Sequence, residues 1–410
     1  MEQPLDIRTV REAFPFFSAN PNLAYLDNSA TSQIPIRVID RLDRYYLHEK
    51  ASPFRGLYDL SVKATDDYEQ AREEVRAFID AESAQEIIFT RNASESLNLC
   101  AYSLGELVVR EGDDLVVSIA EHHSNMLPWQ QLALRKKAHI HYLPCTREGA
   151  FDLDTLAALL TPRTRILAIT QMSNVFGRIN DLKAICALAH EKGVLVVADG
   201  CQSVPHIPVS VRDLGVDFLA FSGHKMLAPM GIGVLYGKRE LLQDMPPFLT
   251  GGEMIDSVTT EGAVWAPLPQ KFEAGTVNTG GAIALGEAIR YYRRIGFSRM
   301  LAREEVLTCR LMKGMADLPH VHIVGSGQKK DHHGIVTFIL DGVHPHDISD
   351  IMSMNGVAIR AGHHCAQPLH QFLGLNATSR ASLMFYNTEE EIDRFLDVLS
   401  GIRGAMGYAD

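Results

Sequence analysis

Two ionisable residues follow neighbouring strand-like runs of the sequence, an aspartate in one case and a lysine in the other. Asp199 comes directly after the apolar run 194–198, and Lys225 follows the run 216–221 and the segment Ser-Gly-His. Ligands of open α/β sheets bind outside the carboxyl ends of the strands, so we expect both side chains at one such edge. A Schiff-base lysine and a carboxylate facing a pyridine nitrogen are what pyridoxal phosphate needs. The alternative, an ordinary ion pair, is favoured for an Asp and a Lys taken alone, because ion pairs outnumber cofactor sites.

The residues around this pair favour the cofactor. Ser222 and His224 come just before Lys225 and offer a hydroxyl and an imidazole to a phosphate group. Ser94 precedes a helical pattern, and a helix N-terminus attracts phosphate through its free N–H groups and its dipole. Taken alone, Ser94 would be interpreted as a plain helix cap.

Two adjacent histidines follow another expected strand. His122 and His123 come after the run 115–119. Neighbouring side chains point in different directions, so a zinc site built from both is not expected. A lone histidine there would be a polar loop residue, but beside a Lys/Asp cofactor site we expect the His122 imidazole to stack on the pyridine ring.

One cysteine differs from the other five of the chain. Cys365 lies in the Gly- and His-rich segment 360–368, close to Arg360 and two histidines. Cationic neighbours and a loop position favour the thiolate over the thiol. A buried small hydrophobic residue is the alternative, and it is our interpretation of Cys100, Cys186 and Cys309. The sequence has no C-x-x-C pair, so neither a zinc knuckle nor a disulfide framework is expected.

Together these segments resemble the group II cysteine desulfurases of the Suf type, which are fold-type I pyridoxal phosphate enzymes. The resemblance runs nearly end to end and is carried by residues 25–28, 222–225, 272–276, 360–366 and 380–382. The segment Arg-x-Gly-His-His-Cys-Ala is highly specific, whereas Ser-Gly-His-Lys is shared with selenocysteine lyases and some epimerases. The chain departs from the usual pattern at Phe54, where relatives often have His, and at Val277, where many have Pro.

The resemblance implies a role for each matching position. The implied catalytic residues are Cys365 as the persulfide-forming nucleophile, Lys225 and His122. The implied cofactor-binding residues are Lys225 (Schiff base), Asp199 (pyridine nitrogen), His122 (ring stacking), Gln202 (phenolic oxygen), and Ser94, Ser222, His224 and Thr276 (phosphate). Thr276 would come from a second subunit, which implies a homodimer. The implied substrate-binding residues are Asn174 and Arg380, which would grip a carboxylate, with Arg360 beside them. No metal site is implied.

The implied activity is conversion of L-cysteine to L-alanine and an enzyme-bound persulfide, for sulfur transfer in iron–sulfur cluster assembly. A selenocysteine lyase shares every cofactor residue, an epimerase or aminotransferase would need no nucleophilic thiol, and a non-catalytic sulfur carrier would need no Schiff base. A sulfur-acceptor protein, either a zinc scaffold-like transferase or a metal-free activator, is the expected partner. His344 and His346 follow a strand and flank Pro345. The favoured interpretation is a polar turn before a helix, and the sharper hypothesis is that one of them perturbs a partner's zinc site.

The elements that must position these residues form an α/β pattern. Apolar runs without alternation predict strands buried on both faces, at 87–90, 115–118, 166–170, 194–198, 218–221 and 232–236. Helical patterns between them, such as 181–192 ended by Gly193, predict a mostly parallel sheet covered by helices. After residue 290 the pattern predicts a smaller α+β domain. It has an amphipathic helix from Phe297 through Leu307, Leu311, Met315 and Leu318, a strand at 334–340 and a terminal helix from about Thr388.

We therefore expect a fold-type I pyridoxal phosphate transferase with a large cofactor-binding domain, 20–290. A small domain of 1–19 plus 291–410 would carry the cysteine loop. The stretch 250–270 is expected to be a long ordered loop, and long loops inside compact domains tend to be functional.

Composition excludes several classes of protein. The chain has 410 residues, 46% hydrophobic and 22% charged, with 39 Lys plus Arg against 50 Asp plus Glu and a net charge of −11. This balance argues against nucleic acids and anionic membranes as partners. No apolar run of about 18 residues predicts a bilayer span, and the first residues lack a signal-peptide pattern. The expected location is cytoplasmic.

Overall fold

A seven-stranded sheet forms the base on which the functional residues are placed. The computed structural model describes residues 4–408. The strand order is β2-β8-β7-β6-β5-β3-β4, in which β8 runs antiparallel to both neighbours and the other pairs are parallel. The strands are β2 (Ile87–Thr90), β3 (Asp114–Ser118), β4 (His139–Leu143), β5 (Thr164–Thr170), β6 (Leu195–Asp199), β7 (Phe218–Ser222) and β8 (Gly233–Gly237).

The expected fold class is confirmed, and all six expected strands of this sheet are present within two residues of their predicted bounds. The seventh strand, β4, was not predicted. It lies at the edge of the sheet, and only Leu143 of its five residues is buried. Its polar positions therefore lack the continuous apolar run that revealed the interior strands.

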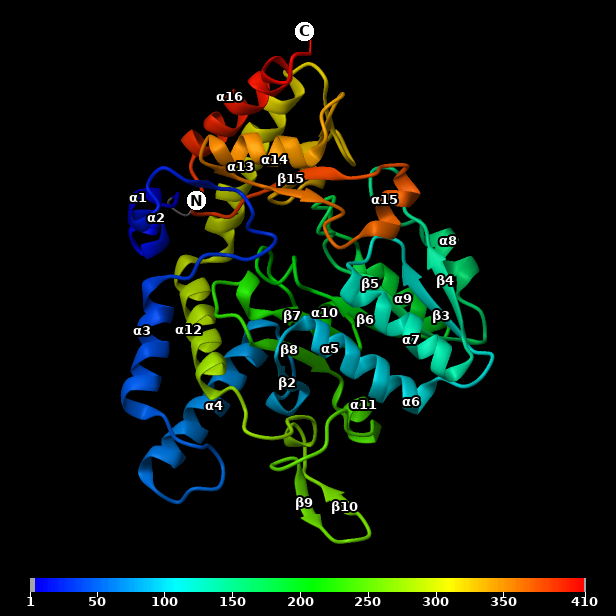
Figure 1. The fold of residues 1–410 in the computed structure, drawn as a ribbon. Helices are drawn as coiled ribbons and strands as arrows, with labels where there is room; N and C mark the ends of the chain where they lie inside the picture. Colours follow the sequence, from blue (N-terminus) through cyan, green and yellow to red (C-terminus); the bar gives the residue numbers. More distant parts are fainter. Residues whose placement is uncertain (1–3, 409–410) are drawn as a thin grey trace.

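Helices cover the sheet on both faces (Figure 1). The helices α3 (Ile36–Arg44), α4 (Asp59–Phe78) and α12 (Thr279–Ile295) pack side by side on one side of it. Its other helices are α5 (Ala93–Leu99), α6 (Gly105–Val108), α7 (Leu127–Lys136), α8 (Leu153–Leu159), α9 (Leu182–Glu191), α10 (Val211–Leu214) and α11 (Arg239–Asp244). As predicted, α9 ends before Gly193, which adopts a left-handed φ of 71°.

A second, four-stranded antiparallel sheet lies above the first (Figure 1). Its order is β11-β12-β15-β14, with β11 (Val321–Ile323), β12 (Ile335–Leu340), β14 (Arg360–Gly362) and β15 (Thr378–Ser382). The helices around it are α13 (Phe297–Ala316), α14 (Pro345–Met354), α15 (Gln367–Leu373) and α16 (Glu389–Ala405). The predicted strand at 334–340 and the terminal helix are confirmed, and a capping box of Thr388 with Glu391 begins α16. Helix α13 ends before Leu318, which the periodicity had placed within it.

The N-terminal segment is tied to this second sheet. After α1 (Ile7–Glu12) and α2 (Pro15–Ala19), strand β1 (Ala24–Tyr25) pairs in parallel with β13 (Val357–Ala358). Asp27 continues the contact through a bridge to Ser382 of β15. The segment therefore brings residues from the start of the chain to strands formed near its end.

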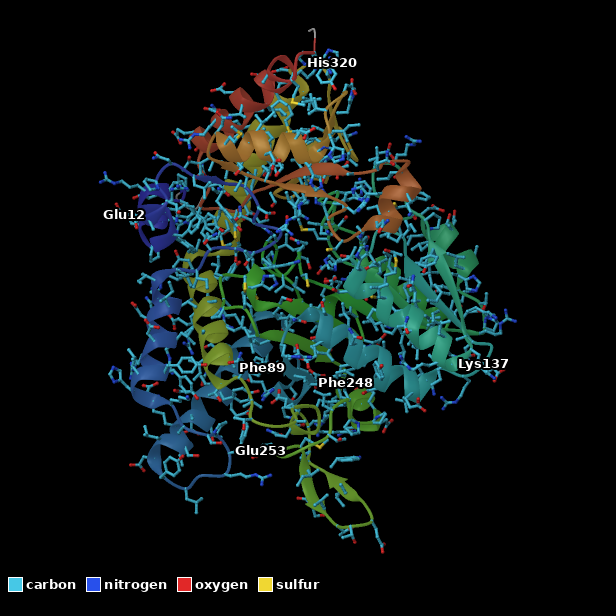
Figure 2. All side chains as sticks on the ribbon, in the orientation of Figure 1. Glu12, Phe89, Lys137, Phe248, Glu253 and His320 are labelled. Carbon is cyan, nitrogen blue, oxygen red and sulfur yellow. The ribbon has the colours of Figure 1, made fainter. Side chains whose placement is uncertain are left out.

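The stretch 250–270 was predicted to be a long ordered loop, and the structure differs there. The segment contains a hairpin of β9 (Ile255–Val258) and β10 (Ala263–Trp265) that projects from the body of the protein (Figure 1). Glu253 lies at its base (Figure 2), where it forms an ion pair with Arg55 at 2.9 Å. Val258 and Val264 are exposed. A hairpin with its apolar residues in solvent does not leave the hydrophobic pattern in the sequence that a buried strand leaves. Among residues 4–408, no helix is long and apolar enough to cross a membrane.

Candidate active site

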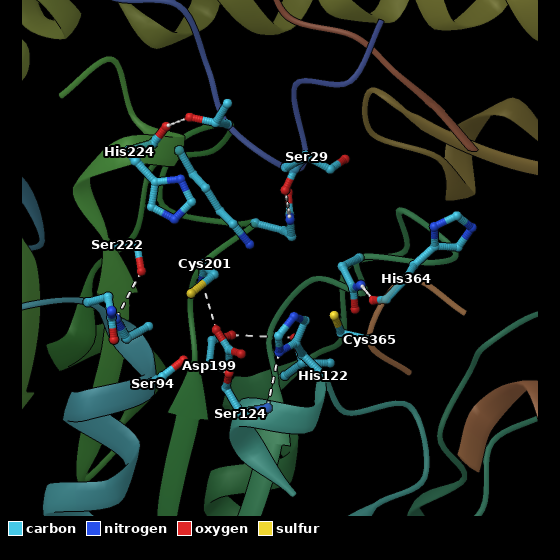
Figure 3. Close-up of a pocket in the computed structure, with 18 of the residues that line it drawn as sticks. Ser29, Ser94, His122, Ser124, Asp199, Cys201, Ser222, His224, His364 and Cys365 are labelled. Atoms are coloured by element: carbon cyan, nitrogen blue, oxygen red, sulfur yellow. Dashed lines mark hydrogen bonds between the residues drawn. The ribbon is translucent and has the colours of Figure 1, made fainter. Parts of the chain in front are cut away.

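A cavity of about 480 Å³ opens between the two sheets, at the carboxyl ends of β5, β6 and β7 (Figure 3). It brings together eleven of the twelve residues predicted for the site. These are Ser94, His122, Asn174, Asp199, Gln202, Ser222, His224, Lys225, Arg360, Cys365 and Arg380. The twelfth, Thr276, is exposed and does not line this cavity. Its assignment to the site of a partner subunit stays a prediction.

Asp199 and Lys225 reach the cavity from neighbouring parallel strands. Asp199 is the last residue of β6, and Lys225 ends the short turn η5 (Gly223–Lys225) that follows β7. Asp199 is buried and its Oδ1 accepts a hydrogen bond from the Cys201 amide at 2.9 Å. A Cβ at Gly223 would approach Ile232 to 2.7 Å, so glycine permits the tight turn that presents the lysine. Both side chains therefore line the cavity from neighbouring strands.

A group of hydroxyls and an imidazole lies at the start of α5. The Ser222 hydroxyl accepts a hydrogen bond from the Ala93 amide at 2.9 Å, and the Ser94 hydroxyl lies 2.6 Å from that of Ser124. Among the described residues, Nδ1 of His224 is buried and has no hydrogen-bond partner. Burial and the Lys225 charge lower the pKa of His224 to about 4. Buried polar atoms are normally paired, so this orphaned nitrogen fits a site completed by a bound phosphate.

His122 forms one wall of the cavity. Its Nδ1 accepts a hydrogen bond from the Ser124 amide at 3.1 Å. Burial, followed by the nearby Lys225 charge, lowers the pKa of His122 to about 4, so its ring is neutral at pH 7. The neighbouring Glu121 anchors this turn, since its carboxyl accepts hydrogen bonds from the Thr170 amide at 2.7 Å and from Asn125 at 2.6 Å. Burial raises the pKa of Glu121 to about 8.

Two arginines stand opposite each other on adjacent strands of the second sheet. Arg360 of β14 pairs in register with Arg380 of β15. Asp27 lies between them, 2.9 Å from Arg360 and 3.4 Å from Arg380. Arg380 is 3% exposed and also donates to the Asn174 carbonyl at 2.9 Å. Burial lowers the pKa of Arg380 to about 10, which leaves it charged at neutral pH. This cluster can bind a carboxylate.

The loop after β14 carries Cys365, the exposed one among the six cysteines, all free thiols. His364 and Cys365 have left-handed φ angles of 51° and 55°. Figure 3 shows the Cys365 sulfur facing the same cavity as the His122 ring. Four other cysteines are buried, and burial raises the pKa of Cys145 to about 11 and of Cys186 to about 12. An exposed thiol, a lysine and a pair of arginines therefore share one cavity.

Several residues in and around this cavity were not predicted from the sequence. Asp27 lies in a segment that carried the resemblance, but nothing in the sequence linked it to the two arginines. His364, Ser29 and Ser124 line the cavity itself and were not predicted either. Among residues 4–408 there is no group of three or more His, Cys, Asp or Glu side chains suited to a metal ion. His344 caps α14, since its Nδ1 accepts from the His346 amide at 3.3 Å. This contact supports the polar-turn interpretation.

Comparison with known proteins agrees with this geometry. Residues 24–395 match the family model described as aminotransferase class-V. A protein of Staphylococcus epidermidis named a probable cysteine desulfurase is 46% identical over 410 residues, covering 99% of each chain. The apo structure of a cysteine desulfurase from Thermococcus onnurineus superposes with a TM-score of 0.93 at 39% identity, covering 98% of this chain and 99% of that one. A crystal structure of an Escherichia coli cysteine desulfurase gives a TM-score of 0.91 at 34% identity, covering 98% of this chain and 100% of the other.

Proposed function

Because the chain belongs to the aminotransferase class-V family, we propose that its cavity performs the reaction for which its relatives are named. The protein is a pyridoxal phosphate-dependent cysteine desulfurase that converts L-cysteine to L-alanine and leaves the sulfur as a persulfide on Cys365. The observation that carries this proposal is that Lys225, Arg380 and Cys365 line one cavity.

The residues present fit pyridoxal phosphate. Lys225 would hold the cofactor through its amine, Asp199 would face the pyridine nitrogen, and His122 and Gln202 would contact the ring and its phenolic oxygen. Ser94, Ser222 and the unpartnered Nδ1 of His224 would hold the phosphate. When bound, the cofactor supplies an electron-accepting ring that weakens bonds at the α-carbon of an amino acid.

The chain's own side chains orient the substrate. Arg380 binds the cysteine carboxylate with the Asn174 side chain, and Arg360 on the opposing strand adds a second cation. Lys225 accepts the proton from Cα. The Cys365 thiolate attacks the substrate sulfur, so that an S–S bond forms as the C–S bond breaks and its electron pair stays with the β-carbon. The β-carbon then takes up a proton and Lys225 returns one to Cα, so that the carbon skeleton leaves as L-alanine.

The active unit is a homodimer in which Thr276 contacts the phosphate in the partner's site. Thr276 is exposed on the segment before α12, where a second copy can reach it. Large hydrophobic side chains exposed between residue 46 and the first turn of α4 support this assembly, because exposed apolar surface marks interaction sites. They are Tyr46, Leu47, Leu57, Tyr58, Leu60 and Val62. The division into a large domain (20–290) and a small domain (1–19 and 291–410) is part of the same proposal.

Within its family the protein belongs to the group II, Suf-type enzymes, and it passes sulfur to an acceptor protein for iron–sulfur cluster assembly. The specific segment 360–366 supports this subclass. The acceptor is of the zinc scaffold-like or activator type. A cytoplasmic location agrees with six free thiols, since disulfides are rare in reducing compartments.

Turnover of L-cysteine by the purified holoenzyme tests the proposal. We expect alanine and sulfane sulfur in equal amounts, and loss of both in Cys365→Ala and Lys225→Ala. Cys309→Ala, a matched change at a partly buried cysteine outside the cavity, should retain activity. Pyruvate and ammonia as the main products would contradict the proposal. Faster turnover of selenocysteine, with selenium release from it surviving in Cys365→Ala, would identify a selenocysteine lyase instead.

A further inference from the structure

The loop that carries Cys365 is held from the side of the large sheet at three points. The side-chain amide of Asn174 donates a hydrogen bond to the His364 carbonyl at 2.8 Å. The backbone N–H of His123 donates to the Cys365 carbonyl at 2.7 Å. The Gln367 backbone N–H donates to Nε2 of the His123 ring at 3.1 Å. His123 thus makes two of the three contacts and grips the loop at the nucleophile and two residues beyond it.

The loop needs such a grip because its backbone is strained. His364 and Cys365 are consecutive non-glycine residues with left-handed φ angles, 51° and 55°. Such conformations persist only where the surroundings impose them. On its C-terminal side the loop is fixed by buried Ala366 and Leu369, whereas Cys365 and Gln367 are exposed. Hydrogen bonds therefore hold the part that presents the sulfur.

The contact with Gln367 defines the state of the His123 ring. An N–H donor at Nε2 requires an unprotonated Nε2, so the neutral ring carries its proton on Nδ1. The groups near this ring are the imidazoles of His122 and His363 and the Cys365 loop. Burial, and then the His363 ring, lower the pKa of His123. The ring is therefore an acceptor at neutral pH.

We propose that His123 is a positioning residue that clamps the Cys365 loop at two points, Cys365 and Gln367, and so holds the thiol over the cavity. This inference rests on the proposed desulfurase function. It predicts that transfer of substrate sulfur to Cys365 depends on His123, while proton removal from Cα by Lys225 does not.

Three substitutions separate the two hydrogen bonds. His123→Gln places an amide oxygen where Nε2 lies and keeps both contacts. His123→Leu removes the contact to Gln367 alone. His123→Pro also removes the N–H that binds the Cys365 carbonyl. Proline suits this position, the first residue of the turn η4 (His123–Asn125), because His122 before it has φ −60° and ψ 148°. His139→Leu, a histidine exposed on β4, is the matched control.

Two measurements test the clamp. The first is amide hydrogen exchange of residues 362–368 without substrate, which does not depend on the proposed function. We expect exchange at Gln367 to be about fivefold faster in His123→Leu and unchanged in His123→Gln and His139→Leu, as fits the loss of one ordinary hydrogen bond. We expect His123→Pro to speed exchange across the whole loop.

The second measurement compares two rates of the holoenzyme, namely persulfide formation on Cys365 from L-cysteine and exchange of the Cα hydrogen of L-alanine with deuterated water. We expect His123→Leu to slow the first severalfold and to leave the second unchanged, with rescue by His123→Gln. Unchanged Gln367 exchange in His123→Leu, or an equal loss of both rates, would overturn the clamp. Absence of persulfide in the parent enzyme would instead overturn the proposed function. If His123→Pro does not fold, the Leu and Gln variants decide the question.

Discussion

Substitution of Glu273 by Gln probes a buried ion pair that lies three residues before Thr276. Glu273 and Arg72 are joined by two hydrogen bonds, of 2.7 and 2.9 Å, and their side chains are 2% and 0% exposed. The same carboxylate accepts from the Phe89 amide at 2.7 Å and from the Tyr68 hydroxyl at 3.0 Å. Glu273→Gln keeps the shape but leaves the Arg72 charge partly uncompensated inside the protein.

The expected cost follows from this geometry. Breaking one side of a buried ion pair costs about 3–5 kcal/mol. Arg72 keeps a second partner, the half-exposed Glu69 at 2.9 Å, so we place the loss of unfolding free energy near the lower figure. With an unfolding entropy of about 2.1 cal/mol/K per residue, a loss of about 3 kcal/mol lowers the apparent Tm of a 410-residue chain by about 3–4 °C.

Thermal melts of the parent and of Glu273→Gln measure this shift. Asp393→Asn is the matched control, because it neutralises one side of an equally short pair, Arg310–Asp393 at 2.7 Å, in which both side chains are 46% exposed. Exposed ion pairs contribute little to the free energy of unfolding, so this variant should have the same Tm as the parent. A Glu273→Gln variant that melts within about 1 °C of the parent would refute the reasoning, as would an equal loss in Asp393→Asn.

Three further outcomes follow from the structure. Iodoacetamide near pH 7 should label Cys365 before any other cysteine, because it is exposed while burial raises the pKa of thiols such as Cys145 and Cys186; peptide mass spectrometry checks this, and earlier labelling of Cys145 or Cys201 would contradict it. Acid should destabilise the cofactor-free protein: the pKa of His122 is about 4 in the folded state and ordinarily about 6.5, so only the unfolded state binds a proton between these values. The contribution of neutral His122 to the free energy of unfolding is then fully present above pH 6.5 and is smaller by about 2 kcal/mol at pH 5. If the urea midpoint falls by the same amount between pH 7 and pH 5 in the parent and in His122→Phe, this is ruled out. Under the polar-turn interpretation, His346→Ala, which leaves the His344 cap in place, keeps full acceptor-stimulated turnover; loss of stimulation alone would favour the zinc-ligand hypothesis.

The large sheet could be predicted because its strands are buried on both faces. Continuous apolar runs such as Val116–Val117 and Phe218–Phe221 are typical of strands in the interior of a sheet that is covered on both faces. Edge strand β4 and the hairpin β9–β10 lack that signal because most of their residues face solvent. The antiparallel direction of β8 was not predictable either, since a buried run has the same apolar character in both directions.

The cavity residues were predictable where their neighbours in sequence identified them. Lys225 and Cys365 each lie in a short segment of specific composition. Asp27 and His123 could not be assigned roles, because their partners lie 333 and 244 residues away along the chain. Such roles come from tertiary contacts, and short-range patterns carry no information about them.

The Asp27 bridge between the two arginines also determines when the site can form during synthesis. Chains emerge from the ribosome N-terminus first, at about 5–20 residues per second, and domains fold as they appear. Asp27 is among the first residues made, whereas its partners Arg360 and Arg380 belong to strands near the end of the 410-residue chain. A nascent or prematurely terminated chain that stops before β14 can contain Lys225 and Asp199 but has no arginine pair and no Cys365. The arginine pair and Cys365 are thus completed together, and a partial product lacks the residues proposed to bind cysteine and accept its sulfur.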